Sequence, residues 1–239
     1  MPTIYANSND GRLSTTYLST FSAARGATAA FSVTTNTTAG TGPGVSRAAT
    51  RGGGSSFQVQ RTFFKFDTSG ITNTVSSATF KFKTNLNISD DDKNLILVSS
   101  DAFTNSGDLQ ASDIDNLDFS TPYSSEIDMN GTSINDVISV TLNSDALSAM
   151  QSESSFIIAM INHPFDFSNS APSSNGLFTS NINYADNTDN ANKPQIEYTE
   201  GAAASGPDNV AFVNTVAAAS IATVNKVAYS SIETINTVS

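Results

Sequence analysis

Aromatic and charged residues alternate along residues 61–83, whose sequence is RTFFKFDTSGITNTVSSATFKFK. A period of two is typical of half-buried antiparallel strands, and the DTSG segment at 67–70 has the residue types of a turn. The pattern predicts two strands with phenylalanines on one inward sheet face and lysines pointing outward, namely Phe64, Phe66, Phe80 and Phe82 against Lys65, Lys81 and Lys83. Two strands cannot bury such a face alone, so a second sheet must cover it.

The rest of the hydrophobic pattern predicts short strands separated by polar turns. The continuous apolar runs LILV at 95–98 and FIIAMI at 156–161 indicate buried strands, the first covered on both faces. Other elements are expected within 3–34, at 134–142, 177–179 and 195–199, with one short helix at 144–151 capped by Ser or Asp. At least eight short strands favour an all-β, jelly-roll-like two-sheet sandwich.

Residues 36–56 break this pattern. They contain TAGTGPG and RGGG, and they predict an irregular loop of about twenty residues. Loops of that length are usually functional or mobile, which makes Arg47 and Arg51 candidate contact residues.

Two stretches carry a resemblance to a known family. The segment FKFDTSGI at 64–71 with SATFKFK at 77–83, and the closing stretch NKPQIEYT at 192–199, resemble the DNRLRE-type jelly-roll domains. The resemblance covers roughly residues 1–200. Such domains occur beside polysaccharide-active enzymes, in cell-surface proteins and in phage virion proteins, so the resemblance implies a jelly roll and makes carbohydrate binding one expected function.

The composition changes at Gly201. Residues 201–208 read as a linker, and residues 209–239 repeat with a period of eleven, as VNTVA at 213, VNKVA at 224 and INTVS at 235. That period would suit a right-handed helical coil, but Val, Ile, Thr and Asn are weak helix formers, which favours strand–turn units. The repeated apolar positions are Val213, Val216, Ile221, Val224, Val227, Ile232, Ile235 and Val238.

This repeat predicts assembly. About thirty residues are too few to bury those side chains alone, and repeats of this kind stack on neighbours. The repeat also resembles the tails of phage structural proteins. The expected partners are therefore copies of the same chain, for example in a homotrimer, and other virion proteins.

The charge is unevenly distributed. The net charge is −11, but residues 1–83 carry eight Lys/Arg against two acids, and residues 84–239 carry three against twenty. Nucleic acid would be repelled over most of such a surface. The charges either solvate opposite strands or pack the basic half of one copy against the acidic half of the next. No apolar run reaches membrane-spanning length, and the start MPTIYANSND lacks the features of a secretory signal.

Few residues can carry catalysis. The chain has no Cys and one His, His163, which excludes thiolate nucleophiles and disfavours a histidine triad. We therefore expect neither an enzyme nor a resident cofactor. Aspartate-rich loops are candidate Ca²⁺ ligands or solvated turns, although their spacing excludes an EF-hand. The candidates are Asp90, Asp91, Asp92, Asp113, Asp115 and Asp118, with a third cluster at Asp186, Asn187, Asp189 and Asn190.

Two functions follow as expectations. The first is a bacteriophage virion structural protein, such as a capsid decoration or cement protein or a fibre component, made in the host cytoplasm and located in the virion. The second is a carbohydrate-binding module or receptor-binding protein for a surface polysaccharide. Tyr123 and Tyr184 are either candidate sugar-stacking residues or core and rim residues, in a chain without Trp.

Overall fold

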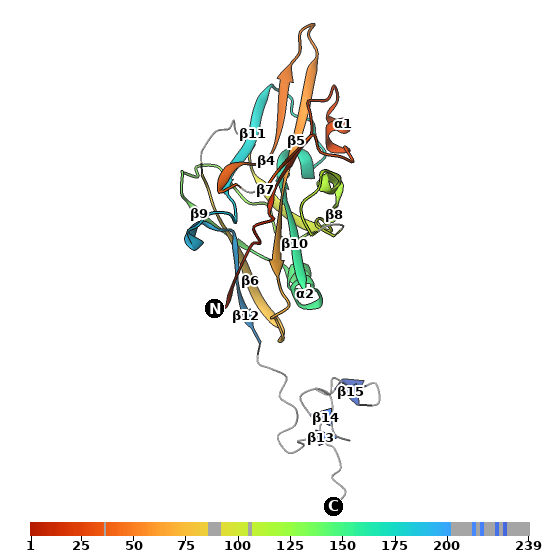
Figure 1. Ribbon diagram of the computed structural model, residues 1–239. Helices are drawn as coiled ribbons and strands as arrows, with labels where there is room; N and C mark the ends of the chain where they lie inside the picture. Colours follow the sequence, from red (N-terminus) through yellow and green to blue (C-terminus); the bar gives the residue numbers. More distant parts are fainter. Residues whose placement is uncertain are drawn as a thin grey trace, which may run out of the picture.

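A computed structural model describes residues 1–35, 37–85, 92–104 and 107–201, together with the backbone of four two-residue strands further along the chain. Two antiparallel sheets pack face to face (Figure 1). The smaller sheet has the order β1 (Thr3–Tyr5), β12 (Gln195–Glu200), β6 (Val75–Lys83), β9 (Val137–Thr141). The larger has the order β11 (Gly176–Asn183), β4 (Ala39–Ala49), β5 (Ser55–Asp67), β10 (Ser155–Asn162), β7 (Leu95–Ser100), β8 (Leu117–Pro122), with β2 (Gly11–Ser14) on β5 and β3 (Ser32–Thr34) on β2. The predicted all-β sandwich is confirmed.

The strand pairing is nested. β4 pairs with β11, β5 with β10, β6 with β9 and β7 with β8. This is the order expected when one long antiparallel hairpin is wrapped over two packed sheets, as in a jelly roll. β6 and β9 lie in the smaller sheet, whereas the other three pairs lie in the larger one.

Short helices connect the strands. They are α1 (Phe21–Arg25), α2 (Ser144–Ser152), the 3₁₀ helices η1 (Ala111–Asp115) and η3 (Asn190–Asn192), and the π-helical turn η2 (His163–Phe167). α2 is the helix that the sequence predicted, but its cap is Asn143, whose Oδ1 accepts a hydrogen bond from the N–H of Ala146 at 3.1 Å. The other turns are too short to show a helical period.

The core between the sheets contains the four predicted phenylalanines, and all four are buried. Their placement on one sheet face is wrong, because β5 and β6 belong to opposite sheets. Phe64 and Phe66 from β5 contact Phe80 from β6 across the core, with ring centroids 5.5 and 6.0 Å apart. The segment between β5 and β6 crosses from one sheet to the other. A hydrogen bond from the N–H of Thr68 to the Ser154 carbonyl fixes its start.

A second apolar cluster covers the outer face of the larger sheet. Phe63 on β5 is as fully buried as Phe64 and packs with Ile96, Val98 and Ile161. Leu109 and Ile114, from the segment around η1, cover them. The run at 95–98 is therefore buried on both faces, as predicted.

The predicted loop at 36–56 is wrong. Residues 39–49 form β4, which pairs with β5 in a hairpin turning at 50–54 and standing out from the sandwich (Figure 1). The glycines are needed because β11 lies so close: a Cβ at Gly44 would collide with Thr179, and one at Gly42 with the carbonyl of Ser180.

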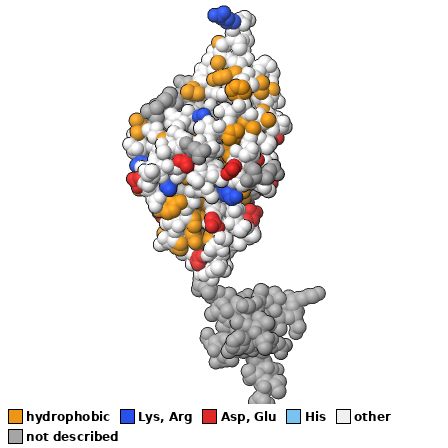
Figure 2. Space-filling model, in the orientation of Figure 1, with side chains coloured by type: hydrophobic (Ala, Val, Ile, Leu, Met, Phe, Trp, Pro, Cys, Tyr) orange, Lys and Arg blue, Asp and Glu red, His pale blue; other side chains and the backbone are white. Residues whose placement is uncertain are grey.

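Arg47 and Arg51, the two arginines of that stretch, lie in different environments. Arg47 lies within β4, where its guanidinium bonds to Ser55 Oγ at 3.0 and 3.1 Å and to the Pro172 carbonyl at 2.7 Å, so it stabilises the hairpin. Arg51 lies in the turn and is exposed, and Figure 2 shows a basic side chain at the tip of this hairpin.

The repeat forms strand–turn units over its first two copies. β13 (Phe212–Val213) pairs with β14 (Val216–Ala217), and β15 (Thr223–Val224) pairs with β16 (Val227–Ala228). Val213 opposes Val216, and eleven residues later Val224 opposes Val227 in the same register. Ile221, Ile232, Ile235 and Val238 lie outside the described residues.

Candidate functional site

Polar side chains gather where β6 and β10 end and β7 begins. We call this region the polar end; its residues are Thr84, Lys93, Asn94, Glu126, Met129, Asn130, Ser133, Asn162, His163 and Ser180. It includes the single histidine of the chain and contacts Asp92, from the predicted aspartate loop. It is therefore a candidate for acid–base or metal chemistry.

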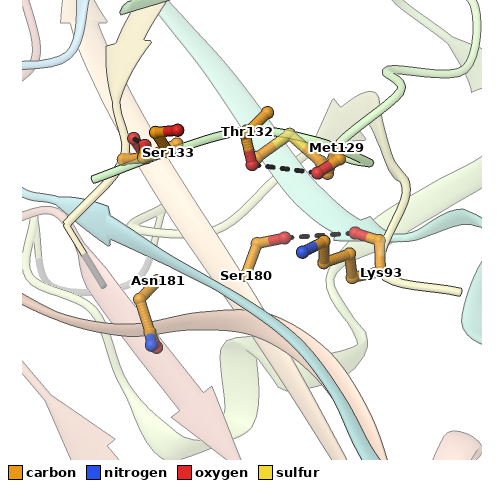
Figure 3. A pocket seen from close by; sticks show the side chains of 7 residues that line it. Lys93, Met129, Thr132, Ser133, Ser180 and Asn181 are labelled. Carbon is orange, nitrogen blue, oxygen red and sulfur yellow. Dashed lines mark hydrogen bonds between the residues drawn. The ribbon is translucent and has the colours of Figure 1, made fainter. Parts of the chain in front are cut away.

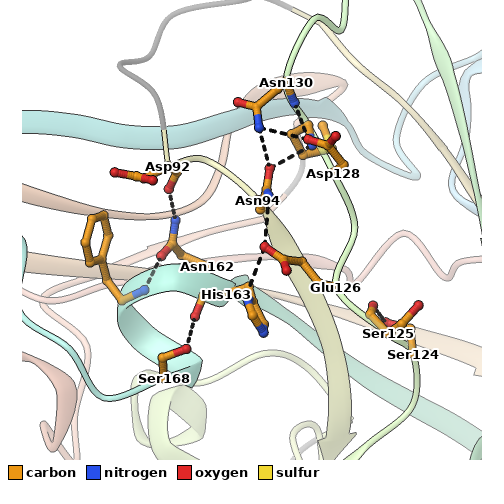
Figure 4. Close-up of polar contacts among 12 residues, drawn as sticks. Asp92, Asn94, Ser124, Ser125, Glu126, Asp128, Asn130, Asn162, His163 and Ser168 are labelled. Atoms are coloured by element: carbon orange, nitrogen blue, oxygen red, sulfur yellow. Dashed lines mark hydrogen bonds and ion pairs between the residues drawn. The ribbon is translucent and has the colours of Figure 1, made fainter.

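A histidine–carboxylate pair lies at its centre (Figure 4). His163 Nδ1 is 3.1 Å from Glu126 Oε1, which also accepts a hydrogen bond from Asn94 Nδ2 at 2.8 Å. The imidazole stacks on Phe167, with centroids 5.5 Å apart. Asn94 Oδ1 in turn accepts from the N–H of Met129 at 3.0 Å. These bonds join the start of β7, the segment before β9 and the end of β10.

Local sequence explains why His163 has this position. Asn162 caps η2, since its Oδ1 accepts from the N–H of Phe165 at 2.9 Å, and Pro164 suits the first turn. The Asn162 Nδ2 donates to the carbonyl of Asp92 at 3.0 Å, and the N–H of His163 donates to the Asn94 carbonyl at 2.8 Å.

The pair has the partners of a structural network. Nucleophilic catalysis requires a hydroxyl or thiol bonded to the imidazole. The hydroxyl of Ser168 donates instead to the backbone oxygen of His163 at 2.9 Å. Over the described ranges, the polar contact of this ring is to Glu126. The geometry therefore orders this end of the sandwich and supplies no activated nucleophile.

A small hollow lies beside the pair (Figure 3). Its volume is about 10 Å³, room for about one water molecule. Three of its walls are held by hydroxyls: Thr84 bonds to the Ser133 carbonyl at 2.6 Å, Ser180 to that of Lys93 at 3.1 Å and Thr132 to that of Met129 at 2.9 Å. A hollow of this size cannot admit a substrate.

Two larger hollows flank the segment 101–110. One, of about 640 Å³, is lined by Lys65, Asp101, Phe103, Thr104, Glu153 and Ile157, among others. The other, of about 420 Å³, is lined by Ser8, Asn9, Thr35, Asp108, Leu109 and Gln110. Both volumes suit small ligands, but their walls are mostly polar, whereas small-molecule pockets are mostly apolar and aromatic.

The predicted metal ligands that the structure describes do not form a group of three acidic or histidine residues. Asp90 and Asp91 lie outside the described residues. Asp113 is buried, and its oxygens accept hydrogen bonds from the N–H of Gln110 at 2.9 Å and from Asn116 Nδ2 at 2.9 Å, so it shapes η1. Asp115 is exposed. In the part of the chain that the structure describes, no three His, Cys, Asp or Glu residues are grouped to hold a metal ion.

Asp118 illustrates the solvated-turn alternative. Its carboxylate accepts from Ser120 Oγ at 2.6 Å, Thr121 Oγ1 at 2.7 Å and the N–H of Ser120 at 2.8 Å. Chiefly the Ser120 hydroxyl, and then the other two donors, lower the pKa of this carboxyl. The group is therefore the ionised acceptor of an exposed turn.

The candidate sugar-stacking residues belong to the core. The Tyr123 ring is 5.3 Å from that of Phe156 and its hydroxyl bonds to Ser99 at 3.0 Å. Tyr184 is 1% exposed, and its hydroxyl donates to the Thr41 carbonyl at 2.9 Å. Neither ring can stack on a sugar in this conformation, so the core alternative describes both residues.

One buried ionic cluster has no signature in the sequence. Arg61 Nε and Nη2 bond to the two carboxylate oxygens of Asp166 at 2.8 and 2.9 Å. The guanidinium also donates to the carbonyls of Ile114 at 2.6 Å and Arg25 at 2.8 Å. Arg25 Nε donates to the carbonyl of Asp166 at 2.7 Å. This cluster joins α1, β5, η1 and η2.

Comparison with known families and with curated protein sequences yields no match, so the DNRLRE-type resemblance remains a prediction. Among the helices that the structure describes, none has both the length and the apolar character needed to cross a membrane.

Proposed function

We propose that this protein is a structural component of a bacteriophage virion, in which residues 1–200 form a displayed β-sandwich and residues 209–239 attach it or assemble it. The observation that carries the proposal is the repeat. Two hairpins eleven residues apart have the same register, with Val213 opposite Val216 and Val224 opposite Val227.

Such units need neighbours. An isolated two-stranded hairpin is at best marginally stable in water, and each hairpin here has strands of only two residues. Repeats with equivalent apolar positions gain stability by stacking on further copies. Further copies can come from other molecules of this protein, either in a free oligomer or on a particle surface that carries many of them. We therefore favour a homo-oligomer that binds other virion proteins.

The sandwich suits a displayed head. Most of its large apolar side chains are buried in three clusters, although a few, such as Phe31 and Val137, are exposed. The face in Figure 2 has few charged side chains and several separate hydrophobic patches. The polar end has room for about one water molecule. These features support a role in which the domain is presented on a particle.

Carbohydrate binding is the second candidate, and the hollow of about 640 Å³ favours it. Lys65, Asp101, Thr104 and Glu153 offer the charged and hydroxyl groups that bond to sugar hydroxyls. Phe103 also lines this hollow but is 2% exposed, so its ring offers little stacking surface.

Light scattering on the full chain tests the assembly role. We expect the wild type to be oligomeric and the double variant V216S/V227S to be monomeric, because the change removes equivalent apolar positions from both hairpins. The control V33S makes the same change at an exposed valine of β3 and should stay oligomeric.

The proposal fails if the wild type is monomeric and a chain ending at Glu200 still attaches to virions. Selective binding on a glycan array would favour the second candidate. In that case E153Q should weaken the binding and V216S/V227S should leave it unchanged.

A further inference from the structure

Two carboxylate oxygens are buried without a partner. Asp10, in the turn between β1 and β2, is 1% exposed, and its Oδ2 accepts a hydrogen bond from the N–H of Ala185 at 3.0 Å. Its Oδ1 has no hydrogen-bond partner, and neither has the buried Oδ2 of Asp186, the residue after Ala185. Because Ala185 contacts Asp10 directly, the two carboxyl groups belong to adjoining turns.

This arrangement is unfavourable as it stands. A buried polar atom without a partner costs free energy, and two like charges close together add to that cost. Burial raises the pKa of Asp10 to about 8, against the lowering effect of the Ala185 hydrogen bond, and the charge of Asp186 raises it further. Lys193 lowers it through its positive charge, but the ion pairs of the described residues do not include Lys193 with either carboxylate.

Both turns are held in place by backbone hydrogen bonds. The N–H of Asp10 bonds to the Asn7 carbonyl at 3.0 Å, and that of Asn7 to the Lys65 carbonyl at 2.8 Å. On the other side, the N–H of Tyr184 bonds to the Thr38 carbonyl at 3.0 Å, and that of Asn187 to the Tyr184 carbonyl at 3.2 Å. The two carboxyl groups are thus positioned by the fold.

We propose that Asp10 and Asp186 form a site for a divalent cation of the Ca²⁺ type, linking the turn before β2 to the turn after β11. A cation placed between the unpartnered oxygens would satisfy both and remove their repulsion. This inference does not depend on the assembly role.

The donor set defines the class of ion. Both donors are carboxylate oxygens, the chain has no Cys, and its one histidine pairs with Glu126. Hard cations prefer such ligands, and Ca²⁺ tolerates irregular geometry and backbone carbonyls better than Mg²⁺ does. The other members of the predicted 186–190 cluster have different partners: Asn187 Oδ1 accepts from the N–H of Asp189, and Asp189 Oδ1 from that of Ala191.

The test is Ca²⁺ binding by the full-length protein, first freed of metal with a chelator. Calorimetry at pH 8 should show binding at one site, and Ca²⁺ should raise the melting temperature relative to excess chelator, because a ligand of the folded state stabilises it.

Three variants locate the site. D10N and D186N should each abolish the binding heat and the melting shift, whereas D115N, at an exposed aspartate, should retain both. D186N keeps the test valid if D10N does not fold. Absence of binding by the wild type in millimolar Ca²⁺ at pH 8 would overturn the proposal. Binding that survives both D10N and D186N would overturn it too, by placing the ion elsewhere.

Discussion

Replacing Asp166 with asparagine should strongly destabilise the sandwich. The Asp166 carboxylate accepts two charged hydrogen bonds from Arg61, and both side chains are buried. Arg25 Nε lies 3.6 Å from the same carboxylate. Burial, followed by the charge of Arg61, lowers the pKa of Arg25, while Asp166 raises it. The D166N change would leave two neighbouring guanidinium groups without their shared counter-charge.

The magnitude follows from this geometry. Removing one partner of a buried ion pair costs about 3–5 kcal/mol, because the remaining charge stays buried and uncompensated. That is a large part of the roughly 5–15 kcal/mol that keeps a domain folded. For a domain of this size, each kcal/mol lowers the melting temperature by about 2–4 °C. The expected decrease is therefore about 6–20 °C.

Urea denaturation followed by circular dichroism would measure the free energy of unfolding. E197Q is the matched control, because Glu197 Oε2 bonds to Lys81 Nζ at 2.6 Å with both side chains about a quarter exposed, at 26% and 27%. Partly solvated pairs contribute about 0–1 kcal/mol. If D166N costs no more than E197Q, the Arg61–Asp166 pair does not support the fold as argued here.

Two further measurements test the core and the buried acid. F80A should lower the free energy of unfolding by about 3–5 kcal/mol, since Phe80 is fully buried between Phe64, Phe66 and Phe82; an unchanged urea midpoint would contradict this packing. The second measurement is the free energy of unfolding against pH, in excess chelator. The contribution of Asp10 should be fully present below about pH 4 and be lost as the pH rises through 8, by up to about 1.4 kcal/mol per pH unit, because folded Asp10 holds a proton that the unfolded chain releases. D10N should remove this slope, and an equal slope in both proteins would rule out Asp10 as its source.

Local pattern determined most of the secondary structure. Alternation along 61–67 and 77–83 identified β5 and β6, and the run at 95–98 identified a strand buried on both faces. In the repeat, the weak helix formers favoured the strand–turn units. Each of these features depends on which residues of one segment are covered. That information lies in neighbouring residues and can be read without knowing the partner.

Tertiary structure alone decided the partners. Period-two alternation is the same whether two strands share a sheet or face each other across a core, so the sequence could not place β5 and β6 in opposite sheets. Gly42 and Gly44, whose residue type favoured a loop, are required in β4 because β11 lies too close for a Cβ atom at either position. Tyr184 suits a binding surface or a core equally well by residue type, and its burial depends on strands distant in the chain.

The candidate sites show the same limit. Arg61 lies 105 residues from Asp166, and Asp10 lies 175 residues from Ala185. Asp113 and Asp118 each bond to nearby amides or hydroxyls, because short turns bring those donors within reach. The two carboxylate oxygens without a partner, on Asp10 and Asp186, belong to segments that meet only when the sandwich closes, since burial and charge are set by the packing of whole sheets.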